Sequence, residues 1–212
     1  VCIEICGDVL TAAPLYADLN NRVHENPAVD ILVADGRKFL SSTREKFDVV
    51  ISDSTHPASF ESWILYTREF YAACRDRLNT NGVFAQWIPI HDLAPEDFRT
   101  IIATIHTAFP NVRVYLSNAY TVVVASDASL AITEDGFNRI AARDTIRTDL
   151  ASVGIRSLDD LNARLIFNEA DAAAFAAGAP VARDDRSPLQ FSERRSFGRM
   201  TVAENMETYL RY

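Results

Sequence analysis

The chain is poor in cysteine, in basic residues and in long apolar runs, and each shortage removes a class of protein. Its three cysteines form neither a CxxC pair nor an even set, so we expect no disulfide framework and a reducing, cytoplasmic location. No run approaches the roughly 18 apolar residues of a membrane-spanning helix. Lys and Arg number 21 against 29 Asp and Glu, for a net charge of −8. This acidity disfavours phosphate-rich partners, so no nucleic-acid binding is predicted.

The remaining composition is that of an ordinary globular protein. Hydrophobic residues make up 48% and charged residues 24% of the chain, which excludes a disordered sequence. A length of 212 residues is enough for one sizeable domain with a small appendage. The chain begins inside a strand-like run without an initiating Met or a signal peptide, so we expect a fragment of a longer protein.

Residues 1–126 alternate strand-like and helix-like segments, which predicts an open α/β fold: a mostly parallel sheet with helices on both faces. Several runs are short, β-branched and almost continuously apolar, as in strands covered on both faces. The expected strands are residues 1–5, 29–34, 47–52, 83–88, 112–117 and 120–125.

Helices are expected at 8–20, with a kink at Pro14, at 62–78 with Asn81-Gly82 as its stop, and from Pro95 onward. Residues 127–212 read as a helical C-terminal extension packed on the sheet domain.

Ligands of open α/β sheets bind at the carboxyl ends of the strands, where three expected strands carry acids. Glu4 could accept ribose hydroxyls or be a solvated acid near a helix start. Asp35 could bond an adenine edge beside Gly36, or it could cap a helix. Asp53 could orient an ammonium and take its proton, or it could cap a polar turn.

Longer patterns resemble the spermidine synthase (polyamine aminopropyltransferase) family. Residues 47–57 (FDVVISDSTHP) resemble its core motif, followed at plausible spacing by 65–71 (LYTREFY) and 82–87 (GVFAQW). Residues 1–5 resemble its cofactor strand and 34–37 its "D-G" segment, so the resemblance covers about residues 1–120. Together with the late DDRSPLQF run, these motifs look closest to bacterial proteins in which such a domain is fused to a membrane transporter-like region.

The resemblance implies a Rossmann-like, methyltransferase-type fold and an adenosyl sulfonium co-substrate, decarboxylated S-adenosylmethionine or S-adenosylmethionine. Asp53 would prepare a small amine for alkyl transfer without a metal. The resemblance and the strand-end positions place the cofactor at Glu4, Asp35, Gly36 and Ser54. The amine would meet His56, Tyr66, Gln86, Trp87 and His91; for Tyr66 and Trp87 the alternative is plain core aromatics.

Two features depart from that family. Its glycine-rich loop after a central strand is absent, since only Gly7 and Gly36 occur in the first 81 residues. His56 stands where the family usually carries a second Asp that binds the polyamine. A neutral imidazole could accept one hydrogen bond there, whereas a protonated one would repel a cationic substrate.

Three functions remain open. The leading one is aminopropyl transfer in polyamine biosynthesis. The second is a methyltransferase that uses full S-adenosylmethionine, and the third is a non-catalytic ligand-sensing or scaffold domain of a membrane protein. A membrane tether through a preceding region and a homodimer are the assemblies that the resemblance suggests, although the sequence identifies no interface.

Overall fold

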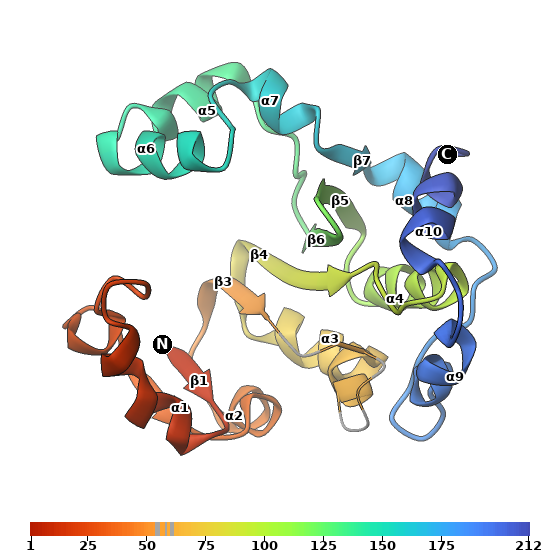
Figure 1. Ribbon diagram of the computed structural model, residues 1–212, viewed down its shortest axis with the longest axis horizontal. Helices are drawn as coiled ribbons and strands as arrows, with labels where there is room; N and C mark the ends of the chain where they lie inside the picture. Colours follow the sequence, from red (N-terminus) through yellow and green to blue (C-terminus); the bar gives the residue numbers. More distant parts are fainter. Residues whose placement is uncertain (54–55, 58, 60–61) are drawn as a thin grey trace. The chain divides into compact units, whose positions relative to one another are not determined.

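The structure is a computed structural model that describes residues 1–53, 56–57, 59 and 62–212 (Figure 1). Strands and helices alternate along the chain, which confirms the predicted α/β class. The chain divides into two compact units, Val1–Glu45 and Lys46–Tyr212. No helix among the described residues is long and apolar enough to cross a membrane.

The first unit contains a two-stranded parallel sheet, in which Ile3 lies opposite Leu32. The predicted helix over 8–20 is shorter and divided in the structure: the α-helix ends at Ala12, and a 3-10 turn with Pro14 near its start follows. The elements are β1 (Cys2–Glu4), α1 (Gly7–Ala12), η1 (Ala13–Tyr16), η2 (Val23–Glu25), β2 (Ile31–Val33) and α2 (Gly36–Ser42).

The second unit is built on a five-stranded sheet of order β3-β4-β6-β5-β7. Only β3 and β4 pair in parallel, and the other three pairings are antiparallel. The sheet is therefore mixed and not mostly parallel as predicted. The strands are β3 (Phe47–Ser52), β4 (Leu78–Pro89), β5 (Asn111–Ser117), β6 (Tyr120–Ser126) and β7 (Leu165–Phe167).

The reason for the difference lies between β5 and β6. Only Asn118 and Ala119 separate these strands, and Asn118 has a φ of 55°. A parallel crossover needs a dozen or more residues, whereas a two-residue turn with positive φ closes an antiparallel hairpin. The short Ser-Asn-Ala connection thus fixes the strand direction.

The predicted helix over 62–78 is divided in the structure. Ser62–Tyr66 forms a 3-10 helix (η3), and Thr67 then caps a separate helix α3 (Arg68–Asp76) by accepting from the Phe70 N–H. Strand β4 begins directly afterwards, at Leu78 and not at 83. Gly82 lies inside that strand: a Cβ there would stand 3.0 Å from the Asn79 carbonyl oxygen, so a larger residue would crowd this irregular stretch.

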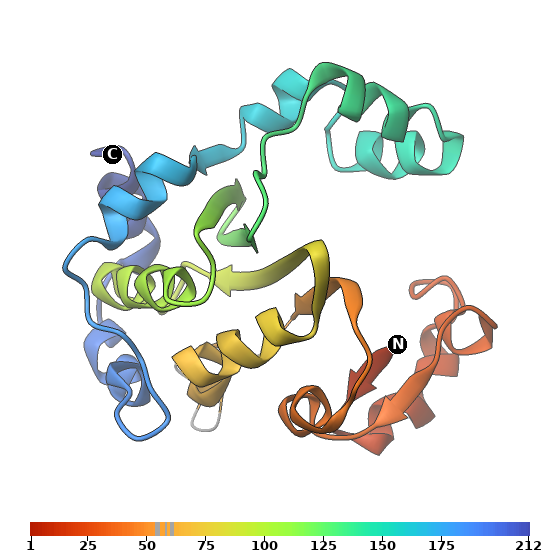
Figure 2. The ribbon, with the colours of Figure 1, turned by 180° about the vertical axis from the view of Figure 1, so that it is seen from behind.

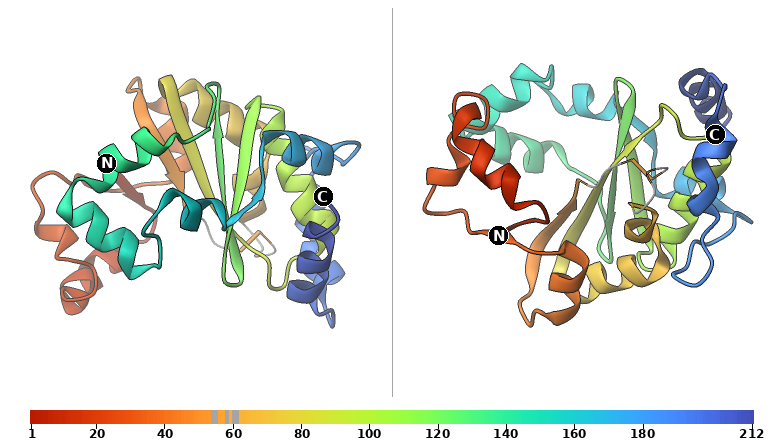
Figure 3. Two further views of the ribbon diagram at one scale, coloured as in Figure 1. Left: turned by 90° about the horizontal axis from the view of Figure 1, so that it is seen from above. Right: turned by 60° about the horizontal axis from the view of Figure 1, so that its bottom comes forward.

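Helix α4 (Pro95–His106) is the centre of the core. It begins at Pro95, as predicted, and its regularly spaced apolar side chains are buried: Phe98, Ile101, Ile102 and Ile105. It contacts α3, α8, α10 and β5. Both views of Figure 3 show α4 (lime green) between the sheet and the C-terminal helices (blue).

Residues after 126 are largely helical, as predicted, and they also extend the sheet. Phe167 of β7 lies opposite Val114 of β5, and its ring is 4.7 Å from that of Phe175. The boundary at 126 stays a prediction. The helices are α5 (Glu134–Ala141), α6 (Asp144–Ser152), α7 (Leu158–Asn162), α8 (Glu169–Ala176), η4 (Pro188–Phe191), α9 (Ser192–Ser196) and α10 (Thr201–Tyr209).

Helices α5 and α6 lie away from α9 and α10, as Figures 1 and 2 show from opposite sides. With α7 they form a small core of their own, made by Phe137, Ile155 and Leu158.

Candidate active site

Two loops meet at the carboxyl edge of the parallel pair β3–β4. Ser52, the last residue of β3, lies opposite Gln86, so both strands end at the same edge of the sheet. The exposed Asp53 follows β3, and His91 follows β4. The Nε2 atom of His56 lies 2.8 Å from the His91 carbonyl oxygen. The structure thus brings together the predicted residues His56 and His91.

The half-buried His56 ring is held in its neutral form. Burial lowers the pKa of the imidazole, while the hydrogen bond to His91 and the nearby charge of Asp92 raise it only in part. Because a carbonyl oxygen only accepts, Nε2 must carry the hydrogen, and the lone pair of the neutral ring is on Nδ1. At neutral pH this residue adds no positive charge to the site.

Gln86 lies fully buried at the base of these loops. Its side-chain N–H groups donate to the Leu65 carbonyl at 3.2 Å and the Ser52 hydroxyl at 3.5 Å, and its oxygen accepts from Tyr71 at 2.8 Å. Burial raises the pKa of Tyr71 well above its usual range, so its hydroxyl remains a donor. The amide therefore ties the ends of β3 and η3 to α3.

The other predicted amine-site residues are distributed differently. Tyr66 is fully buried at the end of η3. Trp87 is half-buried, with its ring 6.1 Å from that of Tyr120. Because successive strand residues point to opposite faces, Trp87 and Gln86 do not share a face of β4. Direct amine contacts by Tyr66, Gln86 and Trp87 stay predictions, and Ser54 lies outside the described residues.

The predicted cofactor residues of the first unit lie at the ends of its two parallel strands. A Glu4 carboxylate oxygen accepts from the Cys6 N–H at 2.8 Å. Asp35 caps α2 by accepting from the Lys38 N–H at 3.0 Å, and the exposed Gly36 begins that helix. The Ala34 N–H donates to the Glu4 carbonyl, so both acids lie at the same edge of the sheet. The Asp35 bond matches its helix-cap alternative, whereas ribose binding by Glu4 and adenine binding by Asp35 stay predictions.

A cavity of about 400 Å³ adjoins the two loops of the second unit. His56 and Asp92 line it from the ends of β3 and β4, and Glu193, Phe197 and Arg199 line it from α9 and the turn after it. The sequence analysis missed the last four. The position of Asp92, next to His91 after a strand, was a usable signal, whereas nothing in the sequence brings α9 to this place.

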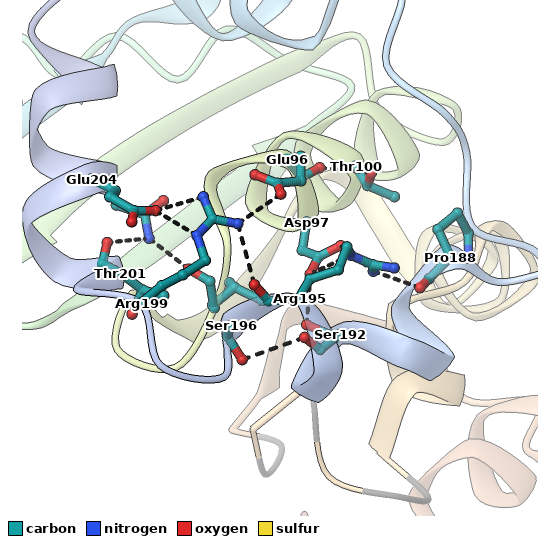
Figure 4. A network of polar contacts seen from close by, with 12 residues as sticks. Glu96, Asp97, Thr100, Pro188, Ser192, Arg195, Ser196, Arg199, Thr201 and Glu204 are labelled. Carbon is teal, nitrogen blue, oxygen red and sulfur yellow. Dashed lines mark hydrogen bonds and ion pairs between the residues drawn. The ribbon is translucent and has the colours of Figure 1, made fainter.

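The C-terminal wall of this cavity is fastened to α4 by ion pairs (Figure 4). Arg199 donates to Glu96 at 2.8 Å and to Glu204 at 2.8 Å, and these bonds raise the pKa of its guanidinium. Arg195 pairs with Asp97, whose side chain is only 2% exposed. The turn between α9 and α10 is therefore held by charges on the first turn of α4.

No three metal-ligating side chains lie close enough to share an ion within the part of the chain that the structure describes.

The profile of the Spermine/spermidine synthase domain matches residues 3–134. This range exceeds half of the chain and contains β2 to β6 with both loops of the candidate site. The chain belongs to the spermine/spermidine synthase domain family. The synthase-domain match stops before α9 and α10, so the C-terminal wall of the cavity lies outside the matched range.

Similar proteins and solved structures support the same family. Over 118 residues the chain is 34% identical to the polyamine aminopropyltransferase of Thermotoga maritima, covering 55% of this chain and 39% of that protein. The crystal structure of the Thermotoga maritima spermidine synthase aligns at a TM-score of 0.50 and 30% identity, over 59% of this chain and 44% of that one.

A probable spermidine synthase from Corynebacterium glutamicum aligns at a TM-score of 0.62 and 19% identity, over 88% of this chain and 63% of that chain. This likeness is one of fold. The chain matches about two fifths of the length of the Thermotoga maritima relative.

Proposed function

We propose that the protein transfers an aminopropyl group from decarboxylated S-adenosylmethionine to a small amine. The observation that carries the proposal is the synthase-domain match over residues 3–134, which includes Asp53 and the His56–His91 contact. The Thermotoga relative, 34% identical, is a polyamine aminopropyltransferase. Because the chain spans 39% of that relative, the activity of the whole protein is part of the proposal.

The reaction is an in-line displacement at carbon. The lone pair of an uncharged amine nitrogen forms a bond to the CH₂ group next to the sulfonium, and the C–S bond breaks with its electron pair staying on sulfur. Methylthioadenosine leaves as a neutral thioether, and the amine nitrogen gives up one proton. In this proposal the Asp53 carboxylate orients the amine and takes that proton, which is the task of a general base.

The neighbouring imidazole supports this role for Asp53. Burial lowers the pKa of His56, so the ring is neutral where the substrate amine is cationic. His56 stands where the family usually carries an Asp. The neutral imidazole therefore removes a negative charge that would attract the substrate, but it adds no positive charge that would repel it. Glu4, Asp35, Gly36 and Ser54 are proposed to bind the adenosyl part, with the two acids at one edge of the first unit's sheet.

Product analysis tests the proposal. The full-length protein is incubated with a small diamine and, in separate reactions, decarboxylated S-adenosylmethionine or S-adenosylmethionine. We expect methylthioadenosine and an amine enlarged by one aminopropyl group, from the decarboxylated compound only. Formation of S-adenosylhomocysteine and a methylated product would show methyl transfer instead. No product from either compound would favour a ligand-sensing or scaffold domain.

The location and assembly of the protein complete the proposal. We propose a domain on the cytoplasmic side, in a protein of the subgroup fused to a membrane transporter-like region, that assembles as a homodimer. Fractionation of cells that express the full-length gene tests the membrane tether: recovery in the membrane pellet supports it, and recovery in the supernatant contradicts it. Light scattering of the purified protein tests the dimer.

A further inference from the structure

One side chain of β4 holds both ends of the connection that carries Asp53 and His56. This connection runs from Ser52, the last residue of β3, to the 3-10 helix η3. The Gln86 amide donates to the Ser52 hydroxyl at 3.5 Å and to the Leu65 carbonyl in η3 at 3.2 Å. Because Gln86 is fully buried, a displacement of η3 would be passed through this amide to the residue before Asp53.

The end of η3 is fixed by a residue far along the chain. The Thr67 hydroxyl lies 2.7 Å from a carboxylate oxygen of Asp184 and 3.2 Å from the Ile64 carbonyl oxygen. A hydroxyl has one hydrogen, and the shorter distance assigns it to the carboxylate, which is the stronger acceptor because it is charged. Thr67 is fully buried, and its oxygen also accepts from the Phe70 N–H in α3. Asp184 thus holds the junction between η3 and α3.

The segment around Asp184 is itself anchored on α3 and α4. The Asp184 N–H donates to a Glu69 carboxylate oxygen at 3.1 Å. The Arg68 N–H donates to the Ala182 carbonyl at 2.9 Å, and the Ala182 N–H donates to the Thr104 hydroxyl at 3.0 Å. These bonds join a segment outside the synthase-domain match to the start of α3. The backbone of Asp184 therefore has a fixed place from which the carboxylate reaches the end of η3.

We propose that Asp184 is a positioning residue that acts through Thr67, η3 and Gln86 to keep Asp53 aligned for proton transfer. This inference rests on the proposed function, because it concerns the geometry of that same site. Asp184 does not touch the reacting atoms, so its loss should leave substrate binding nearly intact and worsen the alignment. A displacement of about 1 Å caused by a change far from the reacting atoms can cost about 10²-fold in rate.

The test compares Asp184→Ala with Asp184→Asn in the full-length protein. Alanine removes the acceptor of the Thr67 hydroxyl, whereas asparagine keeps a side-chain oxygen at the same place. With 1,4-diaminobutane as the amine, kcat for aminopropyl transfer should fall about 10- to 100-fold in Asp184→Ala, with KM almost unchanged. Asp184→Asn should restore most of kcat. Asp185→Ala removes the neighbouring exposed carboxylate and is the matched control, with kcat close to that of the natural protein.

Hydrogen exchange followed by mass spectrometry tests the contact without reference to activity. Asp184→Ala should speed exchange of the amides of η3 and of the first turn of α3, and Asp184→Asn and Asp185→Ala should not.

Unchanged exchange at η3, faster exchange throughout the chain, or an unchanged kcat in Asp184→Ala would each overturn the inference, as would equal losses of kcat in Asp184→Ala and Asp184→Asn. Absence of transfer by the natural protein would instead contradict the proposed function, and the exchange result alone would then decide whether Asp184 holds η3.

Discussion

The Nε2 atom of His56 donates a hydrogen bond to the carbonyl oxygen of His91 across 2.8 Å. This contact joins the loops that follow two parallel strands, and the imidazole rings meet edge to face at 5.5 Å. It fixes the hydrogen on Nε2, and burial keeps the ring neutral. A histidine in this position is therefore compatible with a cationic substrate at neutral pH.

Acidification should destabilise the fold through His56. Its pKa in the folded chain lies below the usual 6.5, so as pH falls through 6.5 the unfolded chain binds a proton that the folded chain does not. The free energy of unfolding must then fall with pH in that window. Urea unfolding at about pH 7.5 and about pH 5.5 measures the loss.

The control for this prediction is His56→Gln, which keeps an N–H for the His91 carbonyl but cannot titrate. This variant should lose less stability over the same interval than the natural protein. Burial also lowers the pKa of His106, so a smaller pH dependence is expected to remain. An identical loss in the two proteins would rule out His56 as a source.

The Asp97 carboxylate should be worth more to stability than a surface acid. It accepts from the Ser192 hydroxyl at 2.7 Å and pairs with Arg195, whose side chain is 31% exposed. Asp97→Ala should lower the free energy of unfolding by about 3 kcal/mol, because it leaves a partly buried guanidinium without its counter-charge. Chemical unfolding measures this loss.

The comparison is Glu207→Ala, which breaks the exposed pair with Arg211 and should cost less than about 1 kcal/mol. Similar losses for the two variants would contradict the role assigned to the Asp97 network in holding α9 on α4.

Tyr71→Phe should destabilise the base of the site. The substitution removes the donor 2.8 Å from the buried Gln86 oxygen, and loss of a buried hydrogen bond costs about 1 to 2 kcal/mol. The neighbouring Phe70→Leu provides a control for lost aromatic packing without loss of that bond. An unfolding free energy unchanged in Tyr71→Phe would show that Gln86 does not depend on this hydroxyl.

The sequence predicts those parts of the fold that depend on neighbouring residues. The start of α4 follows from Pro95 at its first turn, and its buried face follows from the spacing of the apolar residues. The prediction of one continuous helix over 62–78 was wrong. Thr67 caps a new helix at Arg68, and the spacing of apolar residues does not reveal such a cap. Mostly parallel pairing was wrong because the two-residue connection at Asn118 enforces a hairpin.

The candidate site could likewise be predicted only where it depends on local sequence. Acids at strand ends point to Asp53 and, with hindsight, to Asp92, because a sheet gathers the ends of its parallel strands. Glu193 and Arg199 join the cavity through tertiary packing of α9 and α10 on α4, and no local pattern encodes that contact. Burial of Gln86 likewise depends on packing below the loops and could not be read from its place in a strand.

The most direct test of the account is the rate of aminopropyl transfer in Asp53→Asn, with Asp48→Asn as control. Asp48 is an exposed acid on β3, the strand that precedes Asp53, and it accepts from the Asn79 side chain. Loss of a general base should lower the rate by about 10²- to 10⁴-fold in Asp53→Asn, with binding of decarboxylated S-adenosylmethionine nearly unchanged and Asp48→Asn close to the natural protein. Equal rates in the natural protein and Asp53→Asn would contradict the central claim.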